Sequence, residues 1–179
     1  MVCAFTGYRP EKFAFGDDET HPDCVRLRGI LLREIRRLCD LGFTDFLSGM
    51  AMGTDLWCAE AVLSLRDQGL PVRLTAVLPH PEQTRSWPEH WAVRHRAVLA
   101  RADESVTVSP CYTRACMELR NHWLVDHADL VLAVYSGKPG GTAHTIDYAA
   151  RKGLDLMMIH PEAFHVLRLT KEEQTELPL

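Results

Sequence analysis

A turn at residues 48–55 has the composition of an anion-binding site. It reads Ser48-Gly49-Met50-Ala51-Met52-Gly53-Thr54-Asp55, and it separates an apolar run from a helical pattern. In a fold of alternating strands and helices, such a turn exposes backbone N–H groups beside the positive end of the next helix. We therefore expect this turn to bind an anion, above all a phosphate.

A second glycine turn, at residues 136–142, has similar surroundings. It contains Gly137, Gly140, Gly141 and Thr142 after an apolar run and before a helical pattern. Glycine permits positive φ and close approach of a ligand to the backbone, and Thr142 can cap the helix or donate to a phosphate. A flexible connection is the alternative reading, but two such turns together favour a nucleotide or phosphate site. Neither turn has the P-loop pattern or the G-x-G-x-x-G pattern of dinucleotide-binding domains.

Three further polar residues are candidates for ligand binding. Arg9 follows Gly7 and Tyr8 at the end of the first apolar run, where its guanidinium can pair with a phosphate through two hydrogen bonds. Arg120 precedes Asn121, which is the only asparagine in the chain; its amide can bind the edge of a base or a ribose. The alternatives are a surface arginine packed on Tyr8 and an asparagine that bonds a neighbouring loop.

Three carboxylates are candidates for acid or base catalysis. Asp55 and Glu60 lie near the start of the helical pattern after the first turn, and Asp147 lies in the pattern after the second. Asp55 has an alternative role, because a carboxylate stabilises the N-terminus of a helix. The spacing of the three does not require any of them to be catalytic.

The histidines do not have the spacing of a metal site. Two pairs, His90 with His95 and His122 with His127, are five residues apart. This spacing places the two side chains on different sides of a helix, whereas zinc-binding pairs are commonly four apart. We therefore expect no metal ligands.

Strand and helix patterns alternate about five times along the chain. The expected strands are 2–6, 44–47, 72–78, 105–108, 130–135 and 156–159, and the expected helices are 22–41, 54–68, 88–101, 113–127 and 142–152. Alternation predicts an α/β fold, a single Rossmann-like domain with a mostly parallel sheet and helices on both faces. The domain is expected over residues 1–160, followed by a peripheral tail at 161–179.

The predicted topology gathers the candidate residues. Ligands of parallel sheets bind at the carboxyl ends of strands, near the switch in strand order. The loops at 6–10, 48–55 and 136–142 fall at that edge, and the loop at Pro79-His80-Pro81 is a fourth.

Composition narrows the classes of function. The net charge of −4 argues against a general nucleic-acid-binding surface, although it allows a local basic pocket. No apolar run approaches the roughly 18 residues of a membrane helix. The first residues lack the pattern of a signal peptide, and the six cysteines are scattered. We therefore expect a cytoplasmic protein with reduced thiols and no membrane partner.

The motifs at 6–10, 48–57, 120–121 and 135–142, taken together, resemble the YpsA-like (YoqJ-like) family of the SLOG superfamily. This superfamily unites DprA/Smf with the LOG "lysine decarboxylase-like" nucleoside-monophosphate phosphoribohydrolases. The resemblance spans about residues 3–160. It implies a Rossmann-like fold and a pocket for a nucleotide or nucleotide-derived ligand of the NAD or ADP-ribose type. It also implies self-association, because relatives often form homo-oligomers.

The chain departs from the LOG motif P-G-G-x-G-T-x-x-E at a position that matters for catalysis. Here Pro139-Gly140-Gly141-Thr142 continues without that glutamate, and Asp147 is the nearest carboxylate. The favoured function is therefore binding of a nucleotide-derived ligand. An N-glycosidic hydrolase that uses Asp147, Glu60 or Asp55 is the alternative, and a DprA-like binder of single-stranded DNA is disfavoured by the acidic net charge.

Overall fold

The computed structural model describes residues 1–175, which contain one seven-stranded sheet. Its strands are β1 (Val2–Gly7), β2 (Asp45–Ser48), β3 (Arg73–Leu78), β4 (Glu104–Thr107), β5 (Leu130–Val134), β6 (Asp155–Ile159) and β7 (Val166–Leu169). Their order across the sheet is β4-β3-β2-β1-β5-β6-β7. All neighbours pair in parallel except β6 and β7, which are antiparallel. The predicted α/β, Rossmann-like class is confirmed.

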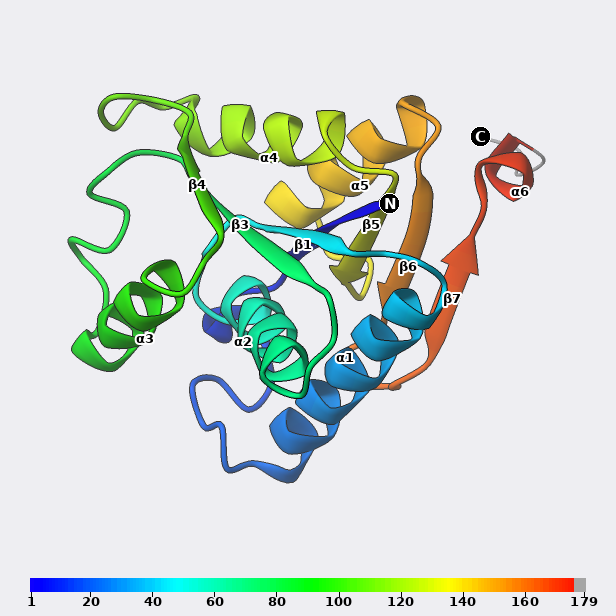
Figure 1. Cartoon of the computed structure of the whole chain (residues 1–179), viewed down its shortest axis with the longest axis horizontal. Helices are drawn as coiled ribbons and strands as arrows, with labels where there is room; N and C mark the ends of the chain where they lie inside the picture. The colour runs from blue at the N-terminus through cyan, green and yellow to red at the C-terminus, as the bar shows by residue number, and fades with distance from the viewer. Residues whose placement is uncertain (176–179) are drawn as a thin grey trace.

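Helices cover both faces of this sheet (Figure 1). They are α1 (Pro22–Asp40), α2 (Thr54–Asp67), α3 (Glu89–Leu99), α4 (Cys116–Asp126), α5 (Gly141–Arg151) and α6 (Lys171–Thr175), with a short 3₁₀ helix, η1 (Pro10–Lys12). The expected helices agree within a few residues, although α4 begins three residues later than expected. Within residues 1–175, no helix has the length and apolar character needed to cross a membrane.

The central strands bury side chains on both faces. In β5, Leu130, Leu132 and Val134 pack into the apolar cluster that contains the inner faces of α1 and α2. The intervening Val131 and Ala133 pack into the cluster shared with α4 and α5. This double burial explains why the strand sequences are nearly continuous apolar runs, as in parallel sheets generally.

The segment after residue 160 contains a strand that the sequence did not indicate. We expected a weakly patterned tail there, but β7 pairs with β6, with Arg168 opposite Met157. Only four residues long, β7 carries this arginine on the face that turns toward α1. A short edge strand with a charged inward residue has no clear apolar alternation, which is why the pattern was missed.

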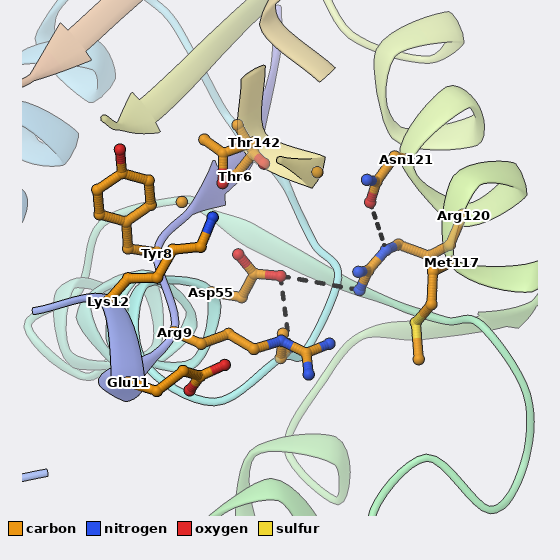
Figure 2. Close-up of a pocket in the computed structure, with 13 residues that line it drawn as sticks. Thr6, Tyr8, Arg9, Glu11, Lys12, Asp55, Met117, Arg120, Asn121 and Thr142 are labelled. Atoms are coloured by element: carbon orange, nitrogen blue, oxygen red, sulfur yellow. Dashed lines mark hydrogen bonds and ion pairs between the residues drawn. The ribbon is translucent and has the colours of Figure 1, made fainter. Parts of the chain in front are cut away.

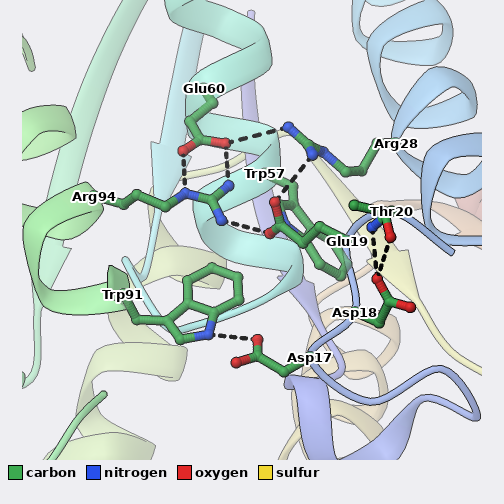
Figure 3. A network of polar contacts seen from close by, with 9 residues as sticks. All are labelled: Asp17, Asp18, Glu19, Thr20, Arg28, Trp57, Glu60, Trp91 and Arg94. Atoms are coloured by element: carbon green, nitrogen blue, oxygen red, sulfur yellow. Dashed lines mark hydrogen bonds and ion pairs between the residues drawn. The ribbon is translucent and has the colours of Figure 1, made fainter. Parts of the chain in front are cut away.

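The long loop between η1 and α1 is fixed by a polar network (Figure 3). Arg94 from α3 binds Glu60 of α2 through two hydrogen bonds, of 2.7 and 2.6 Å, and donates to Glu19 of the loop at 2.5 Å. A second anchor is Asp17, which accepts a hydrogen bond of 2.7 Å from the Trp91 indole. The chain that leads from β1 to α1 is thereby held against α2 and α3.

The buried His95 on α3 makes stability depend on pH. Burial, and to a smaller extent the charge of Arg96, lowers the pKa of this imidazole to about 4. As the pH falls below about 6.5 the unfolded chain takes up this proton and the folded protein does not, so stability is lost until the pH reaches the folded pKa. At pH 5 we expect a loss of about 2 kcal/mol from this residue. Urea unfolding should show that the fall in stability from pH 7 to pH 5 is about 2 kcal/mol smaller in His95→Gln than in wild type. Equal falls in the two proteins would contradict the assignment.

Candidate functional site

A cavity of about 300 Å³ opens where the strand order reverses. Strands β1 to β4 extend the sheet in one direction, and β5 to β7 extend it in the other. The cavity lies at the carboxyl ends of β1 and β5 (Figure 2), as expected for ligand sites in such sheets. Its lining consists of Thr6, Gly7, Tyr8, Arg9, Glu11, Lys12, Ala51, Asp55, Met117, Arg120, Asn121, Gly141 and Thr142.

The N-terminus of α5 faces this cavity with free hydrogen-bond donors. Gly140 caps the helix with φ of 140° and supplies no side-chain cap, and the first turn contains no acidic residue. Thr142 is 7% exposed and lines the cavity, and its hydroxyl has no hydrogen bond to another described residue. The first N–H groups of a helix lack internal partners and attract anions. This end of α5 can therefore bind a phosphate.

Lys12 lies beside the same helix end. Its ammonium is 3.4 Å from the Pro139 carbonyl and 5.1 Å from the centre of the Tyr8 ring. A Cβ at Gly140 would lie only 2.7 Å from Lys12 Nζ, so a larger residue would displace this amine. The absence of a side chain at Gly140 thus lets a cation reach the N-terminus of α5.

A buried ion pair forms another wall of the cavity. Arg120 Nη1 lies 3.8 Å from Asp55 Oδ2, and both residues are 5% exposed. Arg120 also donates to the Gly49 carbonyl and, at 2.9 Å, to Asn121 Oδ1. Burial raises the pKa of the Asp55 carboxyl, and the neighbouring Arg120 opposes this rise only in part. The pair ties α4 to the start of α2.

Arg9 extends from the end of β1 toward this pair (Figure 2). It is partly exposed, and no hydrogen bond or ion pair joins its guanidinium to another residue of the described chain. Its charge nevertheless opposes, in part, the rise in the pKa of Asp55 that burial causes. Arg9 is therefore a cation at the cavity that is available to a ligand.

The 48–55 turn uses several of its N–H groups internally. Met50 N donates to Ser48 Oγ at 3.1 Å, and Ala51 N donates to Asp55 Oδ2 at 3.4 Å. Thr54 N donates to the Tyr8 carbonyl at 3.2 Å. These bonds leave fewer free donors than the sequence suggested, and the carboxylate of Asp55 already faces the turn. The donors open to a phosphate lie instead at the start of α5.

The structure brings together many of the residues that the sequence indicated. Those that line the cavity are Gly7, Tyr8, Arg9, Asp55, Arg120, Asn121, Gly141 and Thr142. Those that are buried outside its lining are Ser48, Gly49, Met50, Gly53, Thr54 and Pro79. Gly137 and Gly140 shape the loop before α5 without lining the cavity.

The candidate carboxylates are separated from one another. Asp55 lines the cavity, whereas Asp147 is exposed on α5 outside the lining, and Glu60 pairs with Arg94 in the α2–α3 layer. Glu11 lines the cavity as well. Among the described residues, no group of three or more His, Cys, Asp or Glu side chains is placed to hold a metal ion.

Several lining residues were not predicted. They are Glu11, Lys12 and Met117, whereas Thr6 and Ala51 lie within the predicted loops 6–10 and 48–55. Lys12 follows Arg9 by three residues, a spacing that places both on one side of a 3₁₀ turn such as η1. This spacing was the signal that could have placed Lys12 beside Arg9, but it has that meaning only if the 3₁₀ helix η1 forms.

A family model described as the YspA SLOG family (YpsA) matches residues 3–163 of this chain. A UPF0398 protein from Bacillus thuringiensis (strain Al Hakam) is 26% identical over 155 residues, which cover 85% of this chain and 84% of that protein. UPF0398 protein BCAH187_A1726 from Bacillus cereus (strain AH187) matches to the same extent.

Two solved structures share the fold. DNA processing protein A from Helicobacter pylori, described for its single-stranded DNA binding mode, has a TM-score of 0.60 and 16% identity, over 89% of this chain and 65% of that chain. DprA from Streptococcus pneumoniae has a TM-score of 0.57 and 15% identity, over 89% of this chain and 50% of that one. The chain therefore spans between half and two thirds of these proteins, and at these identities the likeness concerns the fold.

Proposed function

The chain belongs to the YspA SLOG family, and from that premise we propose that it binds a nucleotide or a nucleotide-derived ligand in the cavity at the carboxyl ends of β1 and β5. One observation carries the proposal: the open N-terminus of α5 shares this cavity with Arg9, Lys12 and Arg120. Cations beside free helix N–H groups suit a phosphate. The carboxylate of Asp55 and the amide of Asn121 offer partners for ribose or base.

The size of the cavity supports a small ligand. Its volume of about 300 Å³ lies at the lower end of the range for ligand pockets, roughly 300–1,000 Å³. A nucleoside monophosphate, or the phosphoribosyl end of a larger molecule such as ADP-ribose, suits such a volume. A longer ligand would extend through the open side.

Cleavage of an N-glycosidic bond is the second candidate, because one carboxylate has the required environment. Asp55 is buried, lines the cavity and has a raised pKa, which are properties of residues that exchange protons with substrates. Of the three carboxylates that the sequence indicated, only Asp55 lines the cavity, so it is the one to test. Its pairing with Arg120 favours a structural role and so favours binding over catalysis.

Thermal shift combined with an assay of free-base release tests both candidates. We would incubate the pure protein with NAD, ADP-ribose, purine monophosphates and a single-stranded oligonucleotide. A rise in Tm with nucleotides and no base release is the expected result. Base release that is lost in Asp55→Asn would support the hydrolase instead. If millimolar nucleotides leave Tm unchanged, the proposed function is wrong; a response to the oligonucleotide alone would favour DNA binding.

Replacing Arg9 by alanine should weaken nucleotide binding without unfolding the protein. The partly exposed guanidinium bonds no described residue, so its removal leaves no unsatisfied internal partner. The loss of a charge-assisted hydrogen bond to phosphate predicts about 1.5–3 kcal/mol of binding free energy, measurable by calorimetric titration. Arg85→Ala is the control, since Arg85 is exposed and pairs with Glu82 outside the cavity lining. Unchanged affinity in Arg9→Ala would remove Arg9 from the site.

A further inference from the structure

Three arginines surround one buried glutamate between α1 and β7, at the opposite end of the sheet from β4. Glu34 Oε1 accepts hydrogen bonds of 3.0 Å from Arg33 Nε and from Arg37 Nη1. Glu34 Oε2 accepts one of 2.9 Å from Arg168 Nη2, and so joins α1 to β7 across 134 residues of sequence. In Figure 1 the two elements lie next to each other at this edge.

The carboxylate is charged at neutral pH. Burial raises the pKa of Glu34, but the hydrogen bonds and charges of Arg168, Arg33 and Arg37 together lower it by more, so that it ends below its ordinary value. Arginine stays protonated in proteins. The cluster therefore contains three positive charges and one negative charge, and Glu34 is the only ion-pair partner of these arginines within residues 1–175.

The arginines are exposed while their anchor is not. The side chain of Glu34 is 0% exposed, whereas those of Arg33, Arg37 and Arg168 are 52%, 57% and 46% exposed. A guanidinium has five N–H donors, and the contacts with Glu34 leave most of them free. Because one buried carboxylate orients all three side chains, a ligand would order them at a smaller cost in side-chain entropy.

A solvent-accessible groove lies beside these donors. It has a volume of about 380 Å³ and is lined by Glu34, Arg37, Val166 and Arg168; we call it the Glu34 groove. It shares no lining residue with the cavity at the carboxyl ends of β1 and β5. Arg33 reaches Glu34 from outside the lining and adds its charge to the same carboxylate.

We propose that the Glu34 groove is a second anion site, which binds a phosphate-bearing dianion through Arg37 and Arg168. The two uncompensated positive charges match a dianion, and the planar guanidinium groups suit bidentate bonds to phosphate oxygens. The site is independent of the nucleotide proposed for the cavity at the carboxyl ends of β1 and β5, because no residue contributes to both linings.

Amide chemical-shift mapping with inorganic pyrophosphate tests this site in the full chain. Saturable shifts are expected at residues 33–37 and 166–169. In Arg168→Ala these shifts should saturate with a Kd higher by roughly tenfold, as expected for one charge-assisted bond. Arg36→Ala is the matched control, because Arg36 is exposed on α1 and bonds Gln68 rather than Glu34; its Kd should equal that of wild type. The same variant set is titrated with a hexanucleotide single strand to distinguish a free phosphate from a nucleic-acid backbone.

Arg168→Lys and Arg37→Ala show whether the weaker binding of Arg168→Ala comes from the lost guanidinium or from a local loss of structure. Arg37→Ala should also raise Kd, while Arg168→Lys keeps the charge and should restore part of the affinity. Shifts confined to residues 7–12 and 141–142, or equal affinities in Arg168→Ala and Arg36→Ala, would overturn the second site. Lys12→Ala should leave the shifts at 166–169 unchanged, so failure here is distinguishable from failure of the proposed nucleotide site.

Discussion

Replacing Arg120 by alanine is expected to lower the free energy of unfolding by about 3–5 kcal/mol, the usual cost of removing one member of a buried ion pair. The substitution leaves Asp55 buried without its counter-charge and takes a donor from the Gly49 carbonyl. Nucleotide affinity should fall as well, because the substitution removes the contact that ties α4 to the start of α2 in the wall of the cavity. Urea unfolding at pH 7 measures the first effect, and calorimetric titration measures the second.

The pH dependence separates charge burial from simple loss of packing. The pKa of Asp55 is already raised by burial, and the loss of Arg120 should raise it further. When the pKa of a carboxyl is higher in the folded protein than in the unfolded chain, protonation stabilises the folded protein. The stability that Arg120→Ala loses should therefore be partly regained as the pH falls below that folded pKa. A deficit that is the same at pH 7 and pH 4.5 would show that Asp55 is not the cause.

A double variant provides the control for Arg120. Apolar residues in place of both members of a buried ion pair are often neutral or stabilising. Arg120→Met with Asp55→Leu should therefore recover most of the stability lost in Arg120→Ala without recovering nucleotide binding. If the double variant is as unstable as the sum of the two single variants, the residues are not coupled.

Gly53→Ala is expected to be comparably destabilising. Gly53 has φ of 81° and ψ of −124°, a region that residues with a side chain avoid at a cost of roughly 1–3 kcal/mol. In addition, its Cβ would lie 2.8 Å from the Tyr8 carbonyl oxygen, and overpacking adds roughly 1–3 kcal/mol. We expect a total loss of about 2–6 kcal/mol in urea unfolding.

Gly69→Ala isolates the contribution of the contact. Gly69 has φ of 92°, and nothing lies within 4 Å of a Cβ built there. Its substitution introduces backbone strain alone, for which about 1–2 kcal/mol is expected. Equal losses in Gly53→Ala and Gly69→Ala would mean that the approach of the 48–55 turn to Tyr8 contributes nothing.

The order of strands and helices could be predicted from the sequence, because it depends on local patterns. A strand such as β5 that is buried on both faces must be apolar throughout, and a helix between two such strands must cross over the sheet. In a parallel sheet the carboxyl ends of the strands, those of β1 and β5 included, lie at the same edge. For that reason Arg9 and Thr142 could be assigned to one site before their positions were known.

Details that depend on side-chain direction could not be predicted. The sequence of the 48–55 turn indicates exposed N–H groups, but their acceptors come from Ser48, Asp55 and Tyr8 once the chain is folded. Likewise, Glu60 is as plausible an acid as Asp55 in the sequence. In the structure, Glu60 is bound by Arg94 of α3, and Asp55 faces the cavity.

By itself the sequence determined the fold class and placed the loops after the strands, including the two glycine turns, at one edge of the sheet, because these follow from periodicity and the rules of parallel sheets. Only the tertiary structure decided which turn keeps its donors free, which carboxylate faces the cavity, and that Arg168 joins Glu34 on α1. These outcomes depend on contacts between residues that are distant along the chain, and no local pattern encodes such contacts.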